Sequence, residues 1–322
     1  MSILVFIEGH EGAFKKSSLE AASYAAALGK LINVPTIAIA IGNYNSEVIQ
    51  ALGANGISKT LHVDNAKLNE PLSMPYATVI AEAAKKVDAK IIIFPRSAVT
   101  DALVSRLGVK LNAGVVTNVL DLPDLTAGFK VKRSIYTGKA FAYVELKSDV
   151  KILTIAKNTI QIAATEGKSE IEKFTPEISD KDFTVVIKEV LKATGDILLT
   201  EADIVVSGGR GLKGPENWQI ILDLAKNLGA ATGCSKPVSD LDWRPHHEHV
   251  GQTGVKVSPN IYIAIGISGA IQHLAGVNSS KVIVVINKDP EAPFFKAADY
   301  GIAGDLFEIL PKLITAAKEL NK

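Results

Sequence analysis

The chain has 322 residues, of which 47% are hydrophobic and 6% aromatic, with 35 basic and 34 acidic side chains. This hydrophobic content excludes a disordered chain, and the length is typical of two domains. The balanced charge argues against a nucleic acid or an anionic membrane surface as a partner. The single cysteine, Cys234, excludes an internal disulfide framework and indicates a reducing compartment.

The N-terminal residues predict a strand over 3–7 and carry neither a basic signal-peptide region nor an Arg-rich transit segment. No apolar run approaches the roughly 18 residues that are needed to cross a bilayer. We therefore expect a cytoplasmic protein that is not inserted into a membrane. The alternative is a mitochondrial-matrix protein from which a presequence has been removed.

Over the first 111 residues, short apolar runs alternate with amphipathic segments rich in Ala and Leu. The predicted strands cover 3–7, 36–42, 57–64 and 90–97, and the predicted helices cover 18–32, 77–87 and 101–111. Right-handed crossovers place such helices on both faces of a sheet. This order therefore predicts an α/β fold with an open, mostly parallel sheet.

The pattern changes after Asn112. Segments 128–146 and 150–156 are rich in Thr, Val and Lys, and they predict antiparallel hairpins appended to the sheet. A polar, charged stretch over 166–181 follows, and 183–187 predicts a late strand.

A second βαβα series begins at Ala202, after a break at 192–196. We therefore predict two domains, an N-terminal α/β domain over 1–192 and a C-terminal domain over 193–322. The predicted elements of the second domain are strands at 203–206, 261–267 and 281–287, and helices at 217–228, at 270–274 and from Asp305 onward. The long loop predicted over 231–257 suggests a functional segment, because loops of that length are uncommon in compact domains.

Two strand ends in the second domain carry residues suited to anion binding. In Ser207–Gly211, the glycines allow a phosphate to approach the backbone and Arg210 supplies charge. An ordinary Gly-rich turn explains this segment equally well, because it is not a full GxGxxG motif. The second strand end, Ser268-Gly269, leads into a helix that opens at Ala270 and carries His273. A neutral histidine there can donate a hydrogen bond to a ligand oxygen, and a surface histidine is the alternative.

Two further positions lie at predicted element ends. Asn287 closes a buried strand, where its amide suits the ribose or adenine edge of a nucleotide. Asp305 begins the last helix and is either a ligand contact or only an N-cap.

The remaining conspicuous residues do not predict a metal site. His246, His247 and His249 are near neighbours on a loop, so their donors diverge, and no second ligand pair completes the set. A solvated or interface loop is the preferred interpretation. Cys234 has no acid or base partner in the sequence and is predicted to be a buried structural thiol.

Taken together, six segments resemble the alpha subunit of electron transfer flavoprotein. They are SGGRGLK (207–213), GCSKP (233–237), VGQTG (250–254), YIAIGISGAIQHLAG (262–276), NKDPEAP (287–293) and ADYGIAGDLF (298–307). The length and the two-domain organisation also fit. The resemblance implies a nucleotide-hydrolase-like N-terminal domain that pairs with a separate beta subunit, and a Rossmann-like C-terminal domain that binds FAD.

By matching positions, the resemblance implies an FAD site with no catalytic residue and no metal. Arg210 and Ser268 hold the pyrophosphate, aided by the backbone of Gly269, Ala270 and Ile271. Ser235, Gln252 and Thr253 face the isoalloxazine ring, with Lys236 beside it, and His273 donates to the O2 side of the ring. Asn287, Asp305 and Leu306 lie at the adenosine end, and Val250, Gly251 and Gln272 complete the enclosure.

The resemblance further implies an electron carrier without a small substrate of its own. Electrons come from flavoprotein dehydrogenases such as those of fatty acid β-oxidation, and pass to a membrane quinone oxidoreductase. Donors near N1 and O2 of the ring, such as His273 and Lys236, favour an anionic flavin semiquinone.

Two residues or segments depart from the family pattern. Lys236 stands where the family commonly has an arginine, which keeps the charge but loses a planar stacking group. The His246–His249 loop is unlike that of many relatives and is assigned to a partner surface.

Two other functions remain open from the sequence. One is an FAD- or NAD-dependent substrate oxidoreductase with catalytic groups in 231–257. The other is a nucleotide-binding regulator that uses the first domain, although that domain lacks an obvious Gly-rich phosphate loop.

Overall fold

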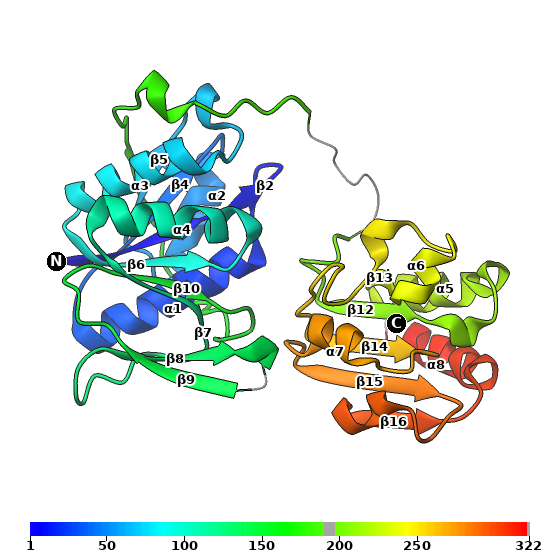
Figure 1. Ribbon diagram of the computed structural model, residues 1–322. Coiled ribbons are helices and arrows are strands. Elements are labelled where there is room, and N and C mark those ends of the chain that lie inside the picture. Colours follow the sequence, from blue (N-terminus) through cyan, green and yellow to red (C-terminus); the bar gives the residue numbers. More distant parts are fainter. Residues whose placement is uncertain (139, 190–196, 321–322) are drawn as a thin grey trace. The chain divides into compact units, whose positions relative to one another are not determined.

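Two units make up the described part of the chain, one within residues 1–190 and the other within residues 191–322 (Figure 1). The computed structural model describes residues 1–138, 140–189 and 197–320. The domain boundary predicted between residues 192 and 193 lies outside the described residues.

The N-terminal unit is a layered α/β structure. Its helices are α1 (Lys16–Ile32), α2 (Ser46–Gln50), α3 (Ser73–Lys86) and α4 (Ala98–Leu111). Its strands are β1 (Ser2–Ile7), β2 (Gly9–His10), β3 (Ala13–Phe14), β4 (Thr36–Ile41), β5 (Lys59–Val63), β6 (Ala89–Pro95), β7 (Gly114–Val119), β8 (Lys130–Ile135), β9 (Ala140–Glu145), β10 (Lys151–Ile155) and β11 (Glu170–Lys173).

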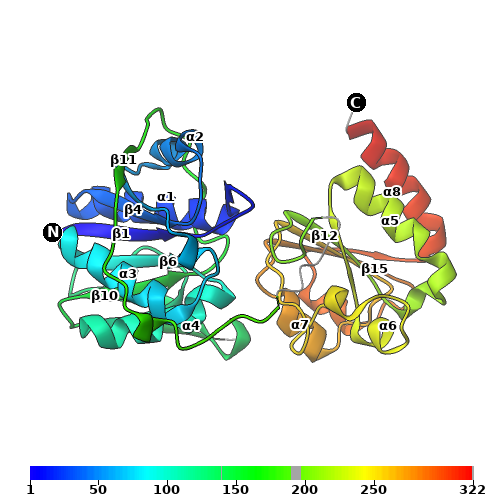
Figure 2. The same ribbon diagram turned by 90° about the horizontal axis from the view of Figure 1, so that it is seen from above.

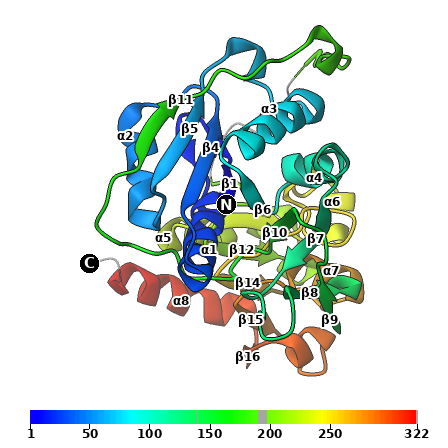
Figure 3. The ribbon, with the colours of Figure 1, turned by 90° about the vertical axis from the view of Figure 1, so that its left-hand side faces the viewer.

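Nine of these strands form one sheet in the order β11-β5-β4-β1-β6-β10-β7-β8-β9, which Figure 3 displays along its length. The strands from β11 to β7 pair in parallel, and β8 and β9 add an antiparallel hairpin at one end. Alternate residues of β1 face opposite sides of the sheet. Leu4 and Phe6 pack with α3 and α4, whereas Ile3, Val5 and Ile7 pack with α1 (Figure 2).

The prediction of an open, mostly parallel sheet with helices on both faces is confirmed, but three details of it are wrong. Segment 150–156 was expected in an antiparallel hairpin, yet it forms β10, a parallel strand between β6 and β7. Four of the five β10 residues are buried, and such a continuous apolar run is the signature of an interior parallel strand.

The other two errors concern the segment that follows. Residues 183–187 form no strand, and Val185 and Val186 are exposed. The polar stretch instead contributes β11, which occupies the free edge of β5. An edge strand needs only one apolar face, so its sequence can be largely polar. A hydrophobicity pattern therefore does not identify it as a strand.

The C-terminal unit is a smaller α/β structure. Its elements are β12 (Ile204–Gly208), α5 (Gln219–Leu228), β13 (Ala231–Cys234), α6 (Lys236–Asp240), β14 (Ile261–Ile265), α7 (Ile271–Val277), β15 (Val282–Asn287), β16 (Tyr300–Ala303) and α8 (Leu306–Leu320). The loop expected over 231–257 therefore contains a strand and a short helix. The pattern missed β13 because this strand has only four residues, and two of them, Ala231 and Gly233, are depleted in strands.

The five strands of this unit pair in parallel in the order β13-β12-β14-β15-β16. Helices α5 and α8 cover one face, where Ile221 and Leu310 join the core residues Val206 and Ile265. Helix α7 covers the other face (Figure 2). The order reverses direction between β12 and β14, and ligands bind at such a switch point, beyond the carboxyl ends of the strands.

Candidate functional site

The loops that leave β12 and β14 touch each other through glycine backbone. The Gly211 amide donates to the Gly266 carbonyl oxygen at 3.1 Å. A Cβ atom on Gly209 would lie 2.2 Å from that same oxygen, and one on Gly211 would lie 2.6 Å from the Gly266 Cα. Gly266 also has φ 62°, a conformation that favours glycine. The glycines are therefore required for the close approach of two loops at the switch point.

Arg210 projects from this glycine cradle. Its side chain is exposed and forms no hydrogen bond or ion pair with the described residues. From the sequence alone, an ordinary turn was an equally good explanation of this segment. The 3₁₀ helix η5 (Arg210–Leu212) holds its backbone, with Leu212 buried in the core. An unpaired guanidinium beside Cβ-free backbone is suited to an anionic ligand.

The 250–254 segment is held against both β13 and α7. The Val250 amide donates to the Cys234 carbonyl at 2.9 Å, and the Gln252 amide donates to the Gln272 carbonyl at 2.7 Å. Gly251 lies so close to Gly276 that a Cβ atom on Gly276 would fall 2.5 Å from the Gly251 Cα. The structure therefore brings together segments that are 15 or more residues apart in the sequence.

Most of the predicted site residues line this edge of the C-terminal sheet. Those with exposed side chains are Arg210, Lys236, Gln252, Thr253, Ser268, Ala270, Ile271 and Gln272. Ser235, Val250, Gly251 and Gly269 are buried beneath them. Ile271 places an apolar side chain at this edge with 64% of its surface exposed.

Ser268 and Gly269 form the turn that leads into α7. Gly269 has φ 82°, and a Cβ atom there would meet the backbone of Phe294 at 2.6 Å. The Phe294 amide donates to the Ser268 carbonyl at 3.1 Å. Phe294, which the sequence analysis did not single out, thus holds the Ser268-Gly269 turn in place.

Lys236 is the first residue of α6, and its ammonium contacts Asp240 one turn later, at 2.9 Å. Both side chains are about half exposed. The charge that was predicted to lie beside the ligand is therefore shared with a carboxylate in this conformation.

His273 is buried, with 7% of its surface exposed, rather than lying on the helix surface. Its Nε2 lies 2.8 Å from the hydroxyl of Tyr262, and its Nδ1 has no hydrogen-bond partner in the described chain. Burial, together with the nearby His249, lowers the pKa of this imidazole to about 4. The side chain is consequently neutral at physiological pH.

At the far end of the same edge, Asn287 binds the turn after β14. Its Nδ2 donates to the Ile267 carbonyl at 3.0 Å, and the Gly304 amide donates to the Asn287 carbonyl, also at 3.0 Å. Asp305 caps α8 by accepting from the Phe307 amide at 2.9 Å. Leu306 points into the core beneath α8, so that only its backbone borders the edge.

The His246–His249 loop is internally bonded. His246 Nδ1 lies 3.1 Å from the Ser239 hydroxyl, and Arg244 pairs with the mostly buried Glu248. No group of three or more His, Cys, Asp or Glu side chains in the described chain is placed to hold a metal ion. Cys234 is fully buried, and burial raises the pKa of its thiol to about 12.

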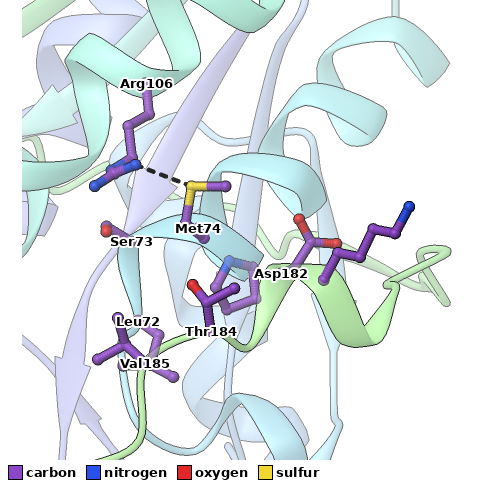
Figure 4. Close-up of a pocket in the computed structure, with 9 residues that line it drawn as sticks. Leu72, Ser73, Met74, Arg106, Asp182, Thr184 and Val185 are labelled. Carbon is purple, nitrogen blue, oxygen red and sulfur yellow. Dashed lines mark hydrogen bonds between the residues drawn. The ribbon is translucent and has the colours of Figure 1, made fainter.

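A separate cavity of about 220 Å³ lies in the N-terminal unit, between the start of α3, Arg106 of α4 and residues 181–185 (Figure 4). The Arg106 guanidinium lies 3.0 Å from the sulfur of Met74, and Thr78 donates to Asp182 at 2.8 Å. None of the predicted site residues lines it.

Among the helices that the structure describes, none is both long and apolar enough to cross a membrane.

Comparison with known proteins decides the family. Residues 3–179 match the electron transfer flavoprotein domain, and residues 198–278 match the electron transfer flavoprotein FAD-binding domain. The chain belongs to the electron transfer flavoprotein alpha-subunit family.

Relatives extend over nearly the whole length. The electron transfer flavoprotein subunit alpha of Bacillus subtilis is 38% identical and that of Pseudomonas aeruginosa 37%, and the alignments cover 99% and 97% of this chain and 98% and 99% of theirs. A probable mitochondrial subunit alpha of Caenorhabditis elegans is 35% identical, over 98% of this chain and 93% of its own.

FAD is the cofactor of this electron transfer flavoprotein family, and the C-terminal edge fits it. A dinucleotide needs backbone that it can approach closely, a cation for its pyrophosphate and donors for its ring. The Gly209–Gly211 cradle, the unpaired Arg210 and the unpartnered Nδ1 of His273 meet these needs. Gly266 and Tyr262 belong to this arrangement although their sequence context gave them no role. The contact between the loops after β12 and β14 reveals Gly266, and the packing of α7 against β14 reveals Tyr262.

Proposed function

We propose that this chain is the alpha partner of a heterodimeric electron carrier. In this proposal the domain over 193–322 holds FAD, and the domain over 1–192 pairs with a separate beta subunit. The observation that carries the proposal is the gathering of Arg210, Gln252 and His273 at one strand edge, around a cradle that admits no Cβ atom. Family membership supports it.

Within that site, each group has a binding role. Arg210 and Ser268 bind the pyrophosphate together with the backbone at 269–271. Ser235, Gln252, Thr253 and Lys236 face the ring, and His273 offers a neutral donor to its O2 side. Asn287 and Asp305 orient the adenosine, Leu306 borders it through the backbone, and Val250, Gly251 and Gln272 close the pocket. The bound FAD supplies all the redox chemistry, and these residues bind it, orient it and keep water away.

We further propose the route of the electrons. They arrive from flavoprotein dehydrogenases such as acyl-CoA dehydrogenases, and they leave to a membrane quinone oxidoreductase. The protein transforms no small substrate of its own. It works in the cytoplasm, or in the mitochondrial matrix.

Partner dependence tests the proposal. The chain expressed alone should retain FAD poorly, whereas co-expression with a beta subunit of the same family should give a yellow heterodimer with stoichiometric FAD. Flavin absorbance against protein concentration, after gel filtration, measures this. Stable stoichiometric FAD in the isolated chain, or oxidation of small substrates by the heterodimer without a dehydrogenase, would contradict the proposal.

A further inference from the structure

Tyr262 and His273 form a closed pair under the proposed FAD site. Tyr262 lies on β14 with no exposed surface, and its hydroxyl is 2.8 Å from Nε2 of His273 on α7. Phe294 contacts both rings, stacked on Tyr262 at 6.4 Å between centroids and edge-on to His273 at 5.6 Å. The imidazole is therefore confined by two aromatic rings, those of Tyr262 and Phe294, and cannot exchange its partner freely.

The hydrogen bond can be made in two ways, because a neutral imidazole carries one proton. If Nε2 carried it, Nε2 would donate to the tyrosine oxygen and Nδ1 would be a bare acceptor. If the Tyr262 hydroxyl donates to Nε2, the proton is on Nδ1. The second arrangement leaves a donor on the other side of the ring.

The burial of the Tyr262 hydroxyl favours the second arrangement. In the described chain this hydroxyl makes one hydrogen bond, to Nε2 of His273, and Tyr262 has no exposed surface. If Nε2 carried the proton, the hydroxyl proton would be left without an acceptor in the interior, which costs free energy. If the hydroxyl donates to Nε2, both groups are satisfied and the imidazole proton lies on Nδ1.

We propose that Tyr262 is a positioning residue that holds neutral His273 in the tautomer with its proton on Nδ1, so that the ring directs a donor toward the Val250–Gly251 turn and an oxygen of bound FAD. The FAD part rests on the proposed function. The tautomer itself depends only on the pair. The other titratable groups near the pair are His249 and the thiol of Cys234, neither of which bonds to the imidazole.

Histidine tautomers can be observed directly. With only histidine labelled with ¹⁵N, long-range proton–nitrogen correlation at pH 7.5 on the FAD-loaded heterodimer should show His273 protonated at Nδ1 and bare at Nε2. A proton on Nε2 in the wild-type protein overturns the proposal. This measurement needs no variant, so it stands even if a substitution prevents folding.

The variant test is Tyr262→Phe, which removes one hydroxyl and keeps the ring. It should populate the tautomer with the proton on Nε2 and raise the dissociation constant of FAD several-fold to about tenfold, as expected for one neutral hydrogen bond. Tyr24→Phe is the matched control. Tyr24 is equally buried in the N-terminal unit, and its hydroxyl donates to the Asp121 carbonyl at 2.8 Å. Tyr24→Phe should change neither the tautomer of His273 nor the dissociation constant of FAD.

The outcomes separate the two proposals. An unchanged tautomer in Tyr262→Phe, or a changed tautomer with unchanged FAD affinity, overturns the positioning role while the FAD site stands. Full FAD retention in both Arg210→Ala and His273→Gln overturns the proposed site instead.

Discussion

The charge of Arg210 has no partner among the described residues, which makes its removal a test of the site. Arg210→Ala should weaken FAD binding by roughly 10- to 100-fold, because a hydrogen bond to a charged group contributes about 1.5–3 kcal/mol. Equilibrium dialysis of the heterodimer measures the loss. Lys213→Ala is the control, because that neighbouring ammonium lies over the Phe307 ring, 5.1 Å from its centroid. Equal retention in Arg210→Ala and the parent would show that Arg210 is only a solvated turn residue.

Lys236 shares its charge with Asp240, so its influence on the flavin should be moderate. Lys236→Ala should lower the midpoint potential of bound FAD by less than about 59 mV, the shift for a tenfold change in a one-electron equilibrium. Asp240→Asn should raise the potential, because it frees the same ammonium. Lys236→Arg should keep or raise it through planar contact. Spectroelectrochemical titration distinguishes these shifts. Identical potentials in all four proteins would place Lys236 away from the ring.

The burial of neutral His273 makes the stability of the C-terminal unit depend on pH. Its pKa falls from an ordinary value of about 6.5 to about 4, so the unfolded chain binds a proton that the folded chain does not. Stability is therefore full above pH 6.5 and declines as the pH falls toward 4, by roughly 3 kcal/mol.

Both tryptophans, Trp218 and Trp243, lie in this unit, so their fluorescence can follow urea unfolding of the FAD-free protein. His273→Gln should remove this part of the acid sensitivity, whereas substitution of the exposed His247 by Asn should not. The idea would be abandoned if the parent and His273→Gln lost stability equally between pH 6.5 and 4.

At the level of elements, sequence periodicity predicted the alternation of strands and helices in both units and the edge at which the site lies. It could not separate β10 from a hairpin, because the neighbour of a strand is decided by long-range pairing. Strand β13 was missed because it has only four residues, of which Ala231 and Gly233 have low strand propensity, and pairing with β12 holds them in the sheet. Tyr262 likewise read as an ordinary core residue, since its partner arrives from α7.

The contact between the loops after β12 and β14 should not tolerate a methyl group. Gly209→Ala should displace the Gly266 loop, destabilise the unit by about 1–3 kcal/mol and reduce FAD retention. Gly229→Asn is the control, because Gly229 has φ 59° in open space, a conformation that asparagine adopts. Urea unfolding and flavin content report the two effects. Wild-type values for Gly209→Ala would mean that the loops are free to separate.

At the scale of the whole molecule, both units expose large apolar side chains on a strand at the end of their sheet. The hairpin strand β9 of the N-terminal unit exposes Phe141 and Tyr143, and β16 of the C-terminal unit exposes Tyr300 and Ile302. Parallel strands are ordinarily covered on both faces, so β16 is unusual in this respect.

Because Cys234 is buried, we expect it not to react in the native protein, so that cysteines introduced elsewhere can be labelled selectively. A thiol whose pKa is raised to about 12 and that has no exposed surface should not react with maleimide in the native state at pH 7. Mass spectrometry should find no adduct on the native chain and one adduct in urea. Cysteines introduced at two exposed positions, one per unit, would then be the only reactive ones, so fluorophore pairs could measure the separation between the units during turnover. Modification of Cys234 without denaturant would show that the core around β13 opens to solvent, and would rule out such measurements.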